Sequence, residues 1–295
     1  MIKTQKINTR YPGIAFLLSL LCTGLGQVYN GDMVKGIGFG LLRCMPLFLI
    51  PLAVLREMSV SYINIFTVMI FICLAFTILA PCEALWRARK SREMPQKAYN
   101  SIPWYGAFSL VNAAITALSI VLLISFFSIE RVTDKTAGPV IGPGDYVLVK
   151  RYPTGGYARG DLVLYEKGAV GRIIALEGDG VRYTGNIFYV NGRALILGYL
   201  ADRLIQRFAT DWEDIISESI DHKRYPIVFK TSAAIYLQQL DPVVKKKHIL
   251  VASDRRIEKN FTASVPLERV RGRIEGILFS SNIRKIMMDS WGGLR

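Results

Sequence analysis

Long apolar stretches mark the first half of the chain. Residues 58–82 and 103–129 contain no charged side chain over 25 and 27 positions, respectively. A bilayer core of about 30 Å requires about 20 apolar residues in a helix, so both stretches predict membrane-spanning helices. The stretch 36–55, which Arg43 interrupts, predicts a third helix, and 13–29 is a fourth and shorter candidate of 17 residues.

The orientation of these helices follows from the basic residues near their ends. Basic residues between the last two stretches predict a cytoplasmic loop, so the final helix should lead outward. A basic N-terminus also predicts a cytoplasmic position. With four full crossings, the N-terminus and this loop would lie on opposite sides of the membrane, so the two predictions could not both hold. We therefore expect 13–29 to be re-entrant or interfacial, or to cross fully in some other orientation. The basic residues are Lys3, Lys6 and Arg10, and then Arg87, Arg89, Lys90, Arg92 and Lys97.

Several residues within the apolar stretches carry expectations of their own. Because no A-x-A-like cleavage site follows 13–29, a cleaved signal peptide is the weaker interpretation. Gly24 and Gly26 predict close packing between helices through small residues. Arg43 is costly inside a bilayer, so it marks either a functional site or a helix end from which its side chain extends to the headgroups.

The second half of the chain follows a different pattern, in which short apolar runs alternate with turn residues from Pro143 onward. The runs are rich in β-branched and aromatic residues and predict strands. Gly-Asp pairs predict turns beside them, and Asn191-Gly192 predicts a hairpin. Residues 200–220 predict a helix from the spacing of their apolar positions. The fold class is thus an α-helical membrane region followed by a mainly antiparallel β domain with a helical insert. The predicted strands are 146–149, 162–165, 172–176, 187–190, 249–252 and 274–279.

Composition agrees with a membrane protein that carries one globular domain. The 295 residues are 51% hydrophobic and 20% charged, and the mean hydropathy is +0.30. These values exclude a disordered chain. We expect residues 1–129 to form the membrane region, with three or four apolar helices, and 130–295 to form the β domain outside the cytoplasm.

The content of cysteine, histidine and lysine limits the chemistry of the β domain. It contains no cysteine, so no disulfide, thiol nucleophile or cysteine-based metal site is available to it. His222 and His248 lack a matching carboxylate cluster, so we expect neither a metal nor a cofactor. The run Lys245-Lys246-Lys247 is typical of a solvated surface. We expect membrane lipid as a partner and no nucleic acid. The four cysteines of the apolar part are Cys22, Cys44, Cys73 and Cys82.

Several segments of the second half, taken in order, resemble the type I signal peptidases, which are Ser–Lys membrane peptidases. The resemblance implies a signal-peptidase-like β fold tethered by membrane helices, with its active site facing outward near the membrane surface. It also implies a bacterial-type cytoplasmic (inner) membrane as the location and signal peptides of exported proteins as ligands. The matching segments are 143–150, 159–163, 171–179, 189–193, 248–256 and 265–273.

The same resemblance shows where this chain departs from the family. The family's serine-containing pattern S-M-x-P-T-L-x-x-G-D falls on 136–145, which places Thr136 at the nucleophilic serine. Gly171 stands where the family has its catalytic lysine. The family's Gly-Asp-Asn-Arg block reads 253–256 here, and the Ser-x-Asp-Ser-Arg stretch that follows it is not recognisable. The motif positions that are kept are Pro139, Gly144, Asp145, Arg172, Gly178, Asp179, Asp254 and Arg256.

Ser–Lys hydrolysis needs a neutral lysine that takes the proton of the nucleophile, and desolvation is what lowers the pKa of such a lysine. Gly171 offers no proton acceptor. Thr136 can act as a nucleophile, although its β-methyl group stiffens the side chain. Lys135 and Lys167 are displaced candidates for the base, but both lie in sequence typical of solvated turns, where a lysine keeps a pKa of about 10.4.

Three hypotheses about function follow. The first is a family member with a degraded site that binds signal peptides, with a strand edge offering β-augmentation. The second is an active signal peptidase I-like endopeptidase, a hydrolase that uses Thr136 and an unconventional base such as Lys167. The third is a non-enzymatic structural subunit of a membrane complex.

Overall fold

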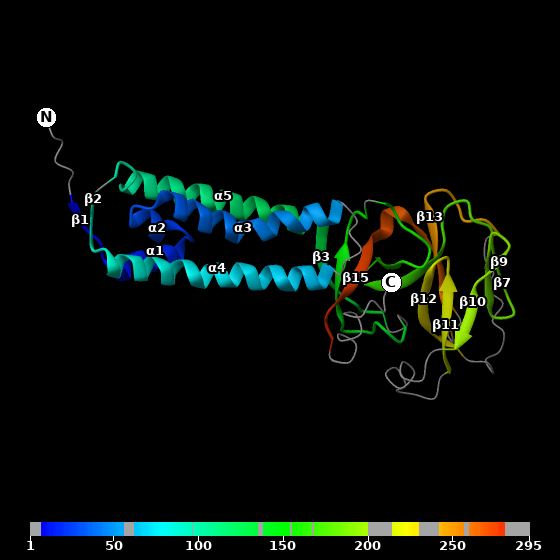
Figure 1. Cartoon of the computed structure of the whole chain (residues 1–295). Helices are drawn as coiled ribbons and strands as arrows, with labels where there is room; N and C mark the ends of the chain where they lie inside the picture. Colours follow the sequence, from blue (N-terminus) through cyan, green and yellow to red (C-terminus); the bar gives the residue numbers. More distant parts are fainter. Residues whose placement is uncertain are drawn as a thin grey trace. The chain divides into compact units, whose positions relative to one another are not determined.

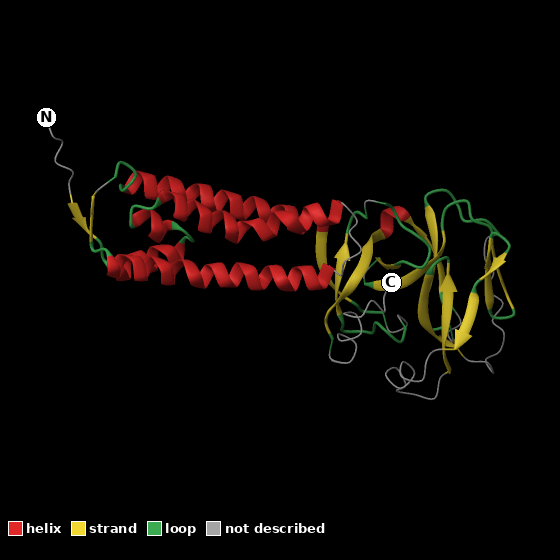
Figure 2. Cartoon of the chain, in the orientation of Figure 1, coloured by secondary structure: helices red, strands yellow, loops and turns green. Residues whose placement is uncertain are grey.

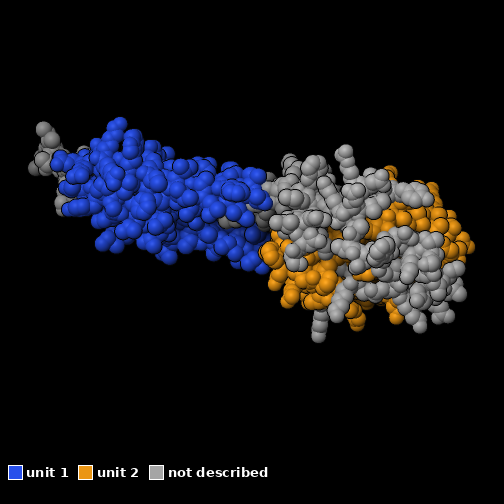
Figure 3. Space-filling view, turned by 90° about the horizontal axis from the view of Figure 1, so that it is seen from below, with its two compact units in different colours: residues 1–60, 64–125 blue, residues 61–63, 126–295 orange. Residues whose placement is uncertain are grey.

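The chain forms two compact units in the computed structural model. One unit comprises Met1–Val60 and Asn64–Ser125, and the other comprises Ser61–Ile63 and Phe126–Arg295 (Figure 3). The structure describes residues 7–55, 62–95, 97–134, 138–153, 155–166, 168–199, 214–229, 242–256 and 260–280.

The long helices of the first unit are α3 (Met33–Leu55), α4 (Tyr62–Lys90) and α5 (Ile102–Phe126), shown in Figures 1 and 2. Residues Thr67–Lys90 of α4 and the whole of α5 are long and apolar enough to cross a membrane. The other elements of the first unit are β1 (Ile7–Thr9), α1 (Pro12–Leu21), α2 (Leu25–Tyr29) and β2 (Glu93–Pro95). Strands β1 and β2 pair antiparallel.

The first apolar stretch, 13–29, is not one helix. Gly24, with φ +97, precedes α2 and separates it from α1. The ten residues of α1 extend about 15 Å at 1.5 Å per residue, against a hydrocarbon core of about 30 Å. A single spanning helix over this stretch is therefore wrong, and a short helical pair replaces it.

Small residues bring these short helices against α4. A Cβ atom on Gly26 would lie 2.8 Å from the Cβ of Ser19 and 2.9 Å from the Cβ of Ala84. The amide of Gln27, which is fully buried, donates to the carbonyl oxygen of Ala80 at 2.6 Å. The predicted close packing at Gly26 is confirmed, because any side chain there would push α2 away from its neighbours.

Arg43 is bonded inside the helical unit. Its Nη2 atom donates to the hydroxyl of Thr116 at 2.8 Å and lies 3.5 Å from the amide oxygen of Asn112, both on α5. These hydrogen bonds do not support the interpretation in which the Arg43 side chain extends to a helix end. The arginine instead links α3 to α5.

The second unit is mainly antiparallel β structure, as predicted, and every pair of its named strands is antiparallel. Its largest sheet has the order β14-β13-β6-β5-β15-β4-β3, and two further sheets have the orders β10-β11-β12 and β7-β8-β9. The strands are β3 (Phe127–Arg131), β4 (Tyr146–Lys150), β5 (Leu162–Tyr165), β6 (Ala169–Ala175), β7 (Val181–Thr184), β8 (Ile187–Val190), β9 (Arg193–Ala194), β10 (Ile196–Tyr199), β11 (Asp214–Ile220), β12 (Lys223–Phe229), β13 (His248–Ala252), β14 (Thr262–Pro266) and β15 (Val270–Phe279), with a 3-10 turn at Leu267–Arg269.

Two sequence-based expectations are corrected here. The predicted helix 200–220 is wrong where the structure describes it, because Asp214–Ile220 forms strand β11 between β10 and β12; residues 200–213 lie outside the described residues. The helix predicted to continue to residue 129 ends at Phe126, and the chain passes directly into β3. In both cases pairing with a distant strand overrides the local pattern.

Strand β6 lies near the middle of the large sheet and contributes to three apolar clusters. Val170 packs with Val140 and Ile141, Ile173 packs with Val251, and Ile174 belongs to a third cluster. The strand that carries positions 171 and 172 is therefore held on both faces.

Candidate functional site

Gly171 lies within β6, where it is buried and has no room for a side chain. A Cβ atom there would lie 2.9 Å from the Cβ of Val251, 3.1 Å from its Cγ2 and 3.2 Å from Cε1 of Tyr165. Contacts this short are almost absent from packed interiors, and strain follows when atoms are forced into such a space. The neighbours of Gly171 thus fill the space that a side chain at this position would need.

Tyr165, which lies against Gly171, is not a base near neutral pH. Burial raises the pKa of this phenol to about 12, and the carboxylates of Asp134 and Glu166 add to the effect. Near neutral pH the hydroxyl is therefore protonated. It can donate a hydrogen bond, but it cannot take a proton from an alcohol.

Thr136 and Lys167, the two residues on which the hypothesis of an active endopeptidase depends, lie outside the described residues. On the N-terminal side of Thr136, the Asp134 carboxylate accepts the Val170 backbone N–H at 3.3 Å. On the C-terminal side, Gly138 has φ +118, and a Cβ there would lie 2.6 Å from the Cβ of Asp254.

The start of β6 is bonded to the segment that follows β3. The backbone N–H of Thr133 donates to the carbonyl oxygen of Gly168 at 3.2 Å. The Asp134 carboxylate accepts the N–H of Val170 in β6. The carbonyl of Gly168, just before β6, and the N–H of Val170 are thus already bonded ahead of the pairing of β6 with β13, which begins at Arg172. An added peptide strand would find these two groups occupied.

Lys150 is fully buried in the second unit, but it does not stand near Gly171. It lies in β4, which is three strands from β6 in the sheet order. Along the sheet this is about 14 Å at 4.7–4.9 Å per strand. Lys150 also pairs with Phe127 at the start of β3, whereas Arg131 at the other end of β3 pairs with Tyr146.

Arg172 and Asp254, two of the retained motif positions, form a buried pair. Arg172 donates Nε and Nη2 to the two carboxylate oxygens at 2.9 and 2.7 Å, and Nη1 to the carbonyl oxygen of Gly160 at 2.8 Å. Its guanidinium carbon lies 3.8 Å from the ring centre of Tyr225. Burial opposes the charge, but Asp254 outweighs it and raises the pKa of Arg172. The pair holds β6 against the end of β13.

Arg256, also retained, forms a second buried pair. Its Nη2 donates to Glu218 at 2.6 Å, and the hydroxyl of Tyr225 donates to the same carboxylate oxygen at 2.8 Å. The side chains of Arg256 and Glu218 are each 2% exposed. Burial, then the Glu218 carboxylate, raises the pKa of Tyr225 well above its ordinary value. Because Tyr225 touches Arg172 as well, these residues connect the large sheet to the β10-β11-β12 sheet.

The remaining retained positions are structural parts of turns. Asp145 and Asp179 each accept the backbone N–H of the residue three positions earlier, Gly142 or Leu176, at 2.8 and 2.7 Å. Asp161, in a third Gly-Asp turn, repeats the arrangement. Gly144 and Gly178 have φ +89 and +81, which favour glycine. Pro139 is half-buried in the described segment that follows residue 137.

Sequence reasoning missed the residues that decide the shape of this region, namely Val251, Tyr165, Asp134 and Glu218. The first two are cross-strand neighbours of Gly171, and their proximity depends on a strand register that the sequence does not display. Glu218 lies in the stretch predicted to be helical. The turn residues Asp221-His222, with Asp221 at φ +51, could have revealed a hairpin there.

No group of metal-binding side chains occurs among the described residues. Residues 107–275, more than half of the chain, match the family model described as signal peptidase, peptidase S26. No curated protein matches the chain.

Proposed function

Because the chain belongs to the signal peptidase family, peptidase S26, we propose that it is a membrane-anchored member with a disabled Ser–Lys site. In this proposal it binds signal peptides of exported proteins without cleaving them. The second unit then lies on the outer face of a bacterial-type cytoplasmic membrane, in agreement with the basic residues between α4 and α5.

The observation that carries the proposal is the packing at Gly171. A serine or threonine hydroxyl is a weak nucleophile without an adjacent base. At position 171 the base is absent, and Val251 and Tyr165 occupy its space. Tyr165 holds its own proton at neutral pH. Restoring a lysine there would therefore require repacking and not only a substitution.

Strand β3 is the edge that we propose for peptide binding. It forms the end of the described seven-stranded sheet and pairs on one side with β4. It follows α5 in the chain without an intervening residue, so it is the first strand of the β domain after the last apolar helix. The side chain of Ile129, 65% exposed, offers an apolar contact. Free strand edges accept extended peptides by main-chain hydrogen bonding.

The test places a photo-crosslinking amino acid at Ile129 of the full-length protein and adds a labelled signal peptide. We expect a crosslinked product and no cleavage. Ile196 on β10, 71% exposed, is the matched control position, and crosslinking there should be much weaker. Equal capture at both positions would contradict binding at β3.

The same incubation tests the enzymatic alternative. Cleavage that disappears in Thr136→Ala, but persists in a variant of an exposed residue such as Arg269→Gln, would establish an active endopeptidase and overturn the proposal. A loss of cleavage in Lys167→Ala as well would identify the displaced base.

A further inference from the structure

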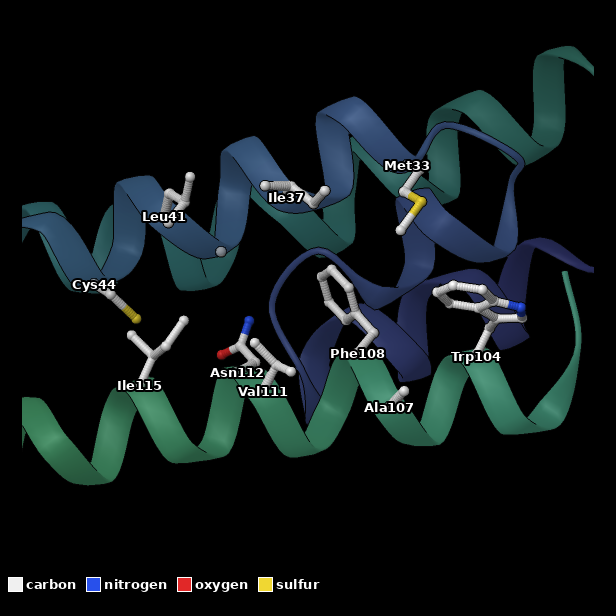
Figure 4. A pocket seen from close by; sticks show the side chains of 11 residues that line it. Met33, Ile37, Leu41, Cys44, Trp104, Ala107, Phe108, Val111, Asn112 and Ile115 are labelled. Atoms are coloured by element: carbon white, nitrogen blue, oxygen red, sulfur yellow. The ribbon is translucent and has the colours of Figure 1, made fainter. Parts of the chain in front are cut away.

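An apolar groove lies between α3 and α5 in the helical unit (Figure 4). Its volume is about 300 Å³. Trp104 and Met33 lie at one end, and Cys44 and Ile115 lie at the other, as the close view shows. Between them the lining is aliphatic and aromatic, with Leu41 55% exposed. The groove is therefore open along its side.

The polar side chains beneath the groove bond to one another and to the backbone, except for the Nε atom of Arg43, which is buried without a hydrogen-bond partner and does not line the groove. The amide nitrogen of Asn112 donates to the carbonyl oxygen of Thr23 at 3.2 Å. Its amide oxygen faces Arg43 at 3.5 Å, and the same guanidinium bonds Thr116. The groove thus presents hydrocarbon to its occupant, which excludes a polar ligand.

The dimensions select the shape of the occupant. Eleven residues separate Trp104 from Ile115 on α5, which is about 17 Å at 1.5 Å per residue. A volume of about 300 Å³ over that length gives an average cross-section of about 18 Å². A helix with side chains, about 10–12 Å across, has a cross-section of about 80–110 Å². A single extended hydrocarbon chain can lie within the groove, whereas a transmembrane helix could insert only its side chains.

The depth of the groove corresponds to one leaflet. Trp104 lies in the first turn of α5, which begins at Ile102, and tryptophan is typical of the membrane–water interface. A groove about 17 Å deep covers about half of a hydrocarbon core of about 30 Å. An acyl chain that enters beside Trp104 therefore ends near the bilayer midplane, beside Ile115.

Positive charge gathers at the Trp104 end of this unit. The ammonium group of Lys97 donates to the carbonyl oxygen of Gly31, two residues before Met33, at 2.8 Å. Among the described residues of this end, Asp32 and Glu83 are already paired with Arg87 and Lys35. The exposed basic residues are Arg89, Lys90, Arg92 and Lys97, beside the exposed carboxylate of Glu93.

We propose that the groove between α3 and α5 binds one acyl chain of a phospholipid with an anionic headgroup, which the basic residues at the Trp104 end hold. Each basic side chain near an anionic lipid surface contributes about 1 kcal/mol, or about fivefold in affinity. The proposal concerns the helical unit alone and is independent of what the β domain binds.

Trp104 is a built-in reporter for this site. The chain has four tryptophans, and Trp86→Phe, Trp212→Phe and Trp291→Phe leave Trp104 alone in the full-length protein. The protein is reconstituted in phosphatidylcholine vesicles that contain a small, fixed fraction of lipid brominated on its acyl chains. Either phosphatidylglycerol or phosphatidylcholine carries the bromine. At the same fraction of brominated lipid, we expect brominated phosphatidylglycerol to quench Trp104 at least about fivefold more effectively than brominated phosphatidylcholine.

Two sets of variants separate the chain from the headgroup. Leu41→Phe should fill the groove and abolish the preferential quenching, whereas Leu118→Phe, at a residue of α5 that does not line the groove and is 55% exposed, should not. Combined Arg89→Gln, Lys90→Gln and Arg92→Gln should leave quenching but remove the preference for phosphatidylglycerol.

Other occupants predict other results. Equal quenching by the two brominated lipids would mean ordinary annular lipid and would overturn the proposal. So would a brominated apolar helical peptide that quenches Trp104 and displaces brominated phosphatidylglycerol, because the occupant would then be a helix.

Discussion

Glycine inside a buried strand weakens it unless a neighbour uses the space that the missing side chain leaves. At Gly171 the neighbours do so from two strands, since Val251 comes from β13 and Tyr165 from β5. The packing therefore leaves no space for a lysine at this position. This closure supports the proposal that the Ser–Lys site is disabled.

Gly171→Ala is expected to lower the free energy of unfolding by about 1–3 kcal/mol, because its Cβ meets Val251 and Tyr165. Urea denaturation of the full-length protein measures this. Gly180→Ala is the matched control: its Cβ would find no atom closer than 3.7 Å, so a change within about 0.5 kcal/mol is expected. Equal losses in the two variants would mean that position 171 is not closed.

Arg172 and Asp254 illustrate a different cost, that of an unpaired buried charge. Their side chains are 1% and 2% exposed. We expect Arg172→Met to cost about 3–5 kcal/mol in the free energy of unfolding, since it leaves Asp254 buried without its partner. The exposed pair Arg269–Glu166, at 62% and 52%, serves as the control, and Arg269→Met should cost about 0–1 kcal/mol. A small loss at Arg172 would remove this pair from the framework of the site.

At the level of secondary-structure elements, turns were the most predictable feature of the β domain. A glycine that adopts a positive φ and an aspartate that closes on its own backbone act within a few residues, so the sequence displays them. The hairpin at Asn191-Gly192 is confirmed in the same way, with φ +50 and +78. Strand β11 was not predictable, because its partners β10 and β12 and its buried Glu218 depend on the tertiary fold. The closure around Gly171 depends on register between strands, which is equally non-local.

The Gly178-Asp179 turn leads to a prediction about pH. Burial works against the charge of Asp179, but hydrogen bonds from Arg159, the Leu176 backbone N–H and Asn191 outweigh it and lower the pKa of this carboxyl. Its contribution to stability is therefore complete above the unfolded pKa of about 3.9 and is lost as the pH falls through the lower folded value. Unfolding by urea at a series of acid pH values follows this loss.

Asp179→Asn should cost about 1–3 kcal/mol at pH 7 and should remove that part of the acid dependence. Asp221→Asn is the control, because Asp221 is 56% exposed and lies 3.6 Å from Arg159. The interpretation of the turn fails if the acid limb of the Asp179→Asn variant is as steep as that of the unchanged protein.

For the molecule as a whole, the membrane helices and the β domain answer to different physical constraints. The apolar stretches that became α4 and α5 were predictable because a bilayer imposes a minimum length and an absence of charge. The pairing of α1 and α2 was not, since it depends on contacts such as that between Gly26 of α2 and Ser19 of α1. The orientation of these helices is a prediction from charge, based on the basic residues near the ends of α4 and α5.

We therefore expect the end of the chain to lie outside the cytoplasm. A phosphatase that is active only outside the cytoplasm, fused after Arg295, should be active, and the same reporter placed after Arg92 should be silent. The physical reason is that Arg87, Arg89, Lys90, Arg92 and Lys97 resist translocation, so α5 must carry the β domain across. A green fluorescent reporter at the same two positions supplies the reciprocal signal. An active phosphatase after Arg92 with a silent one after Arg295 would reverse the orientation, and a domain in the cytoplasm could not meet exported segments on their way out of the membrane.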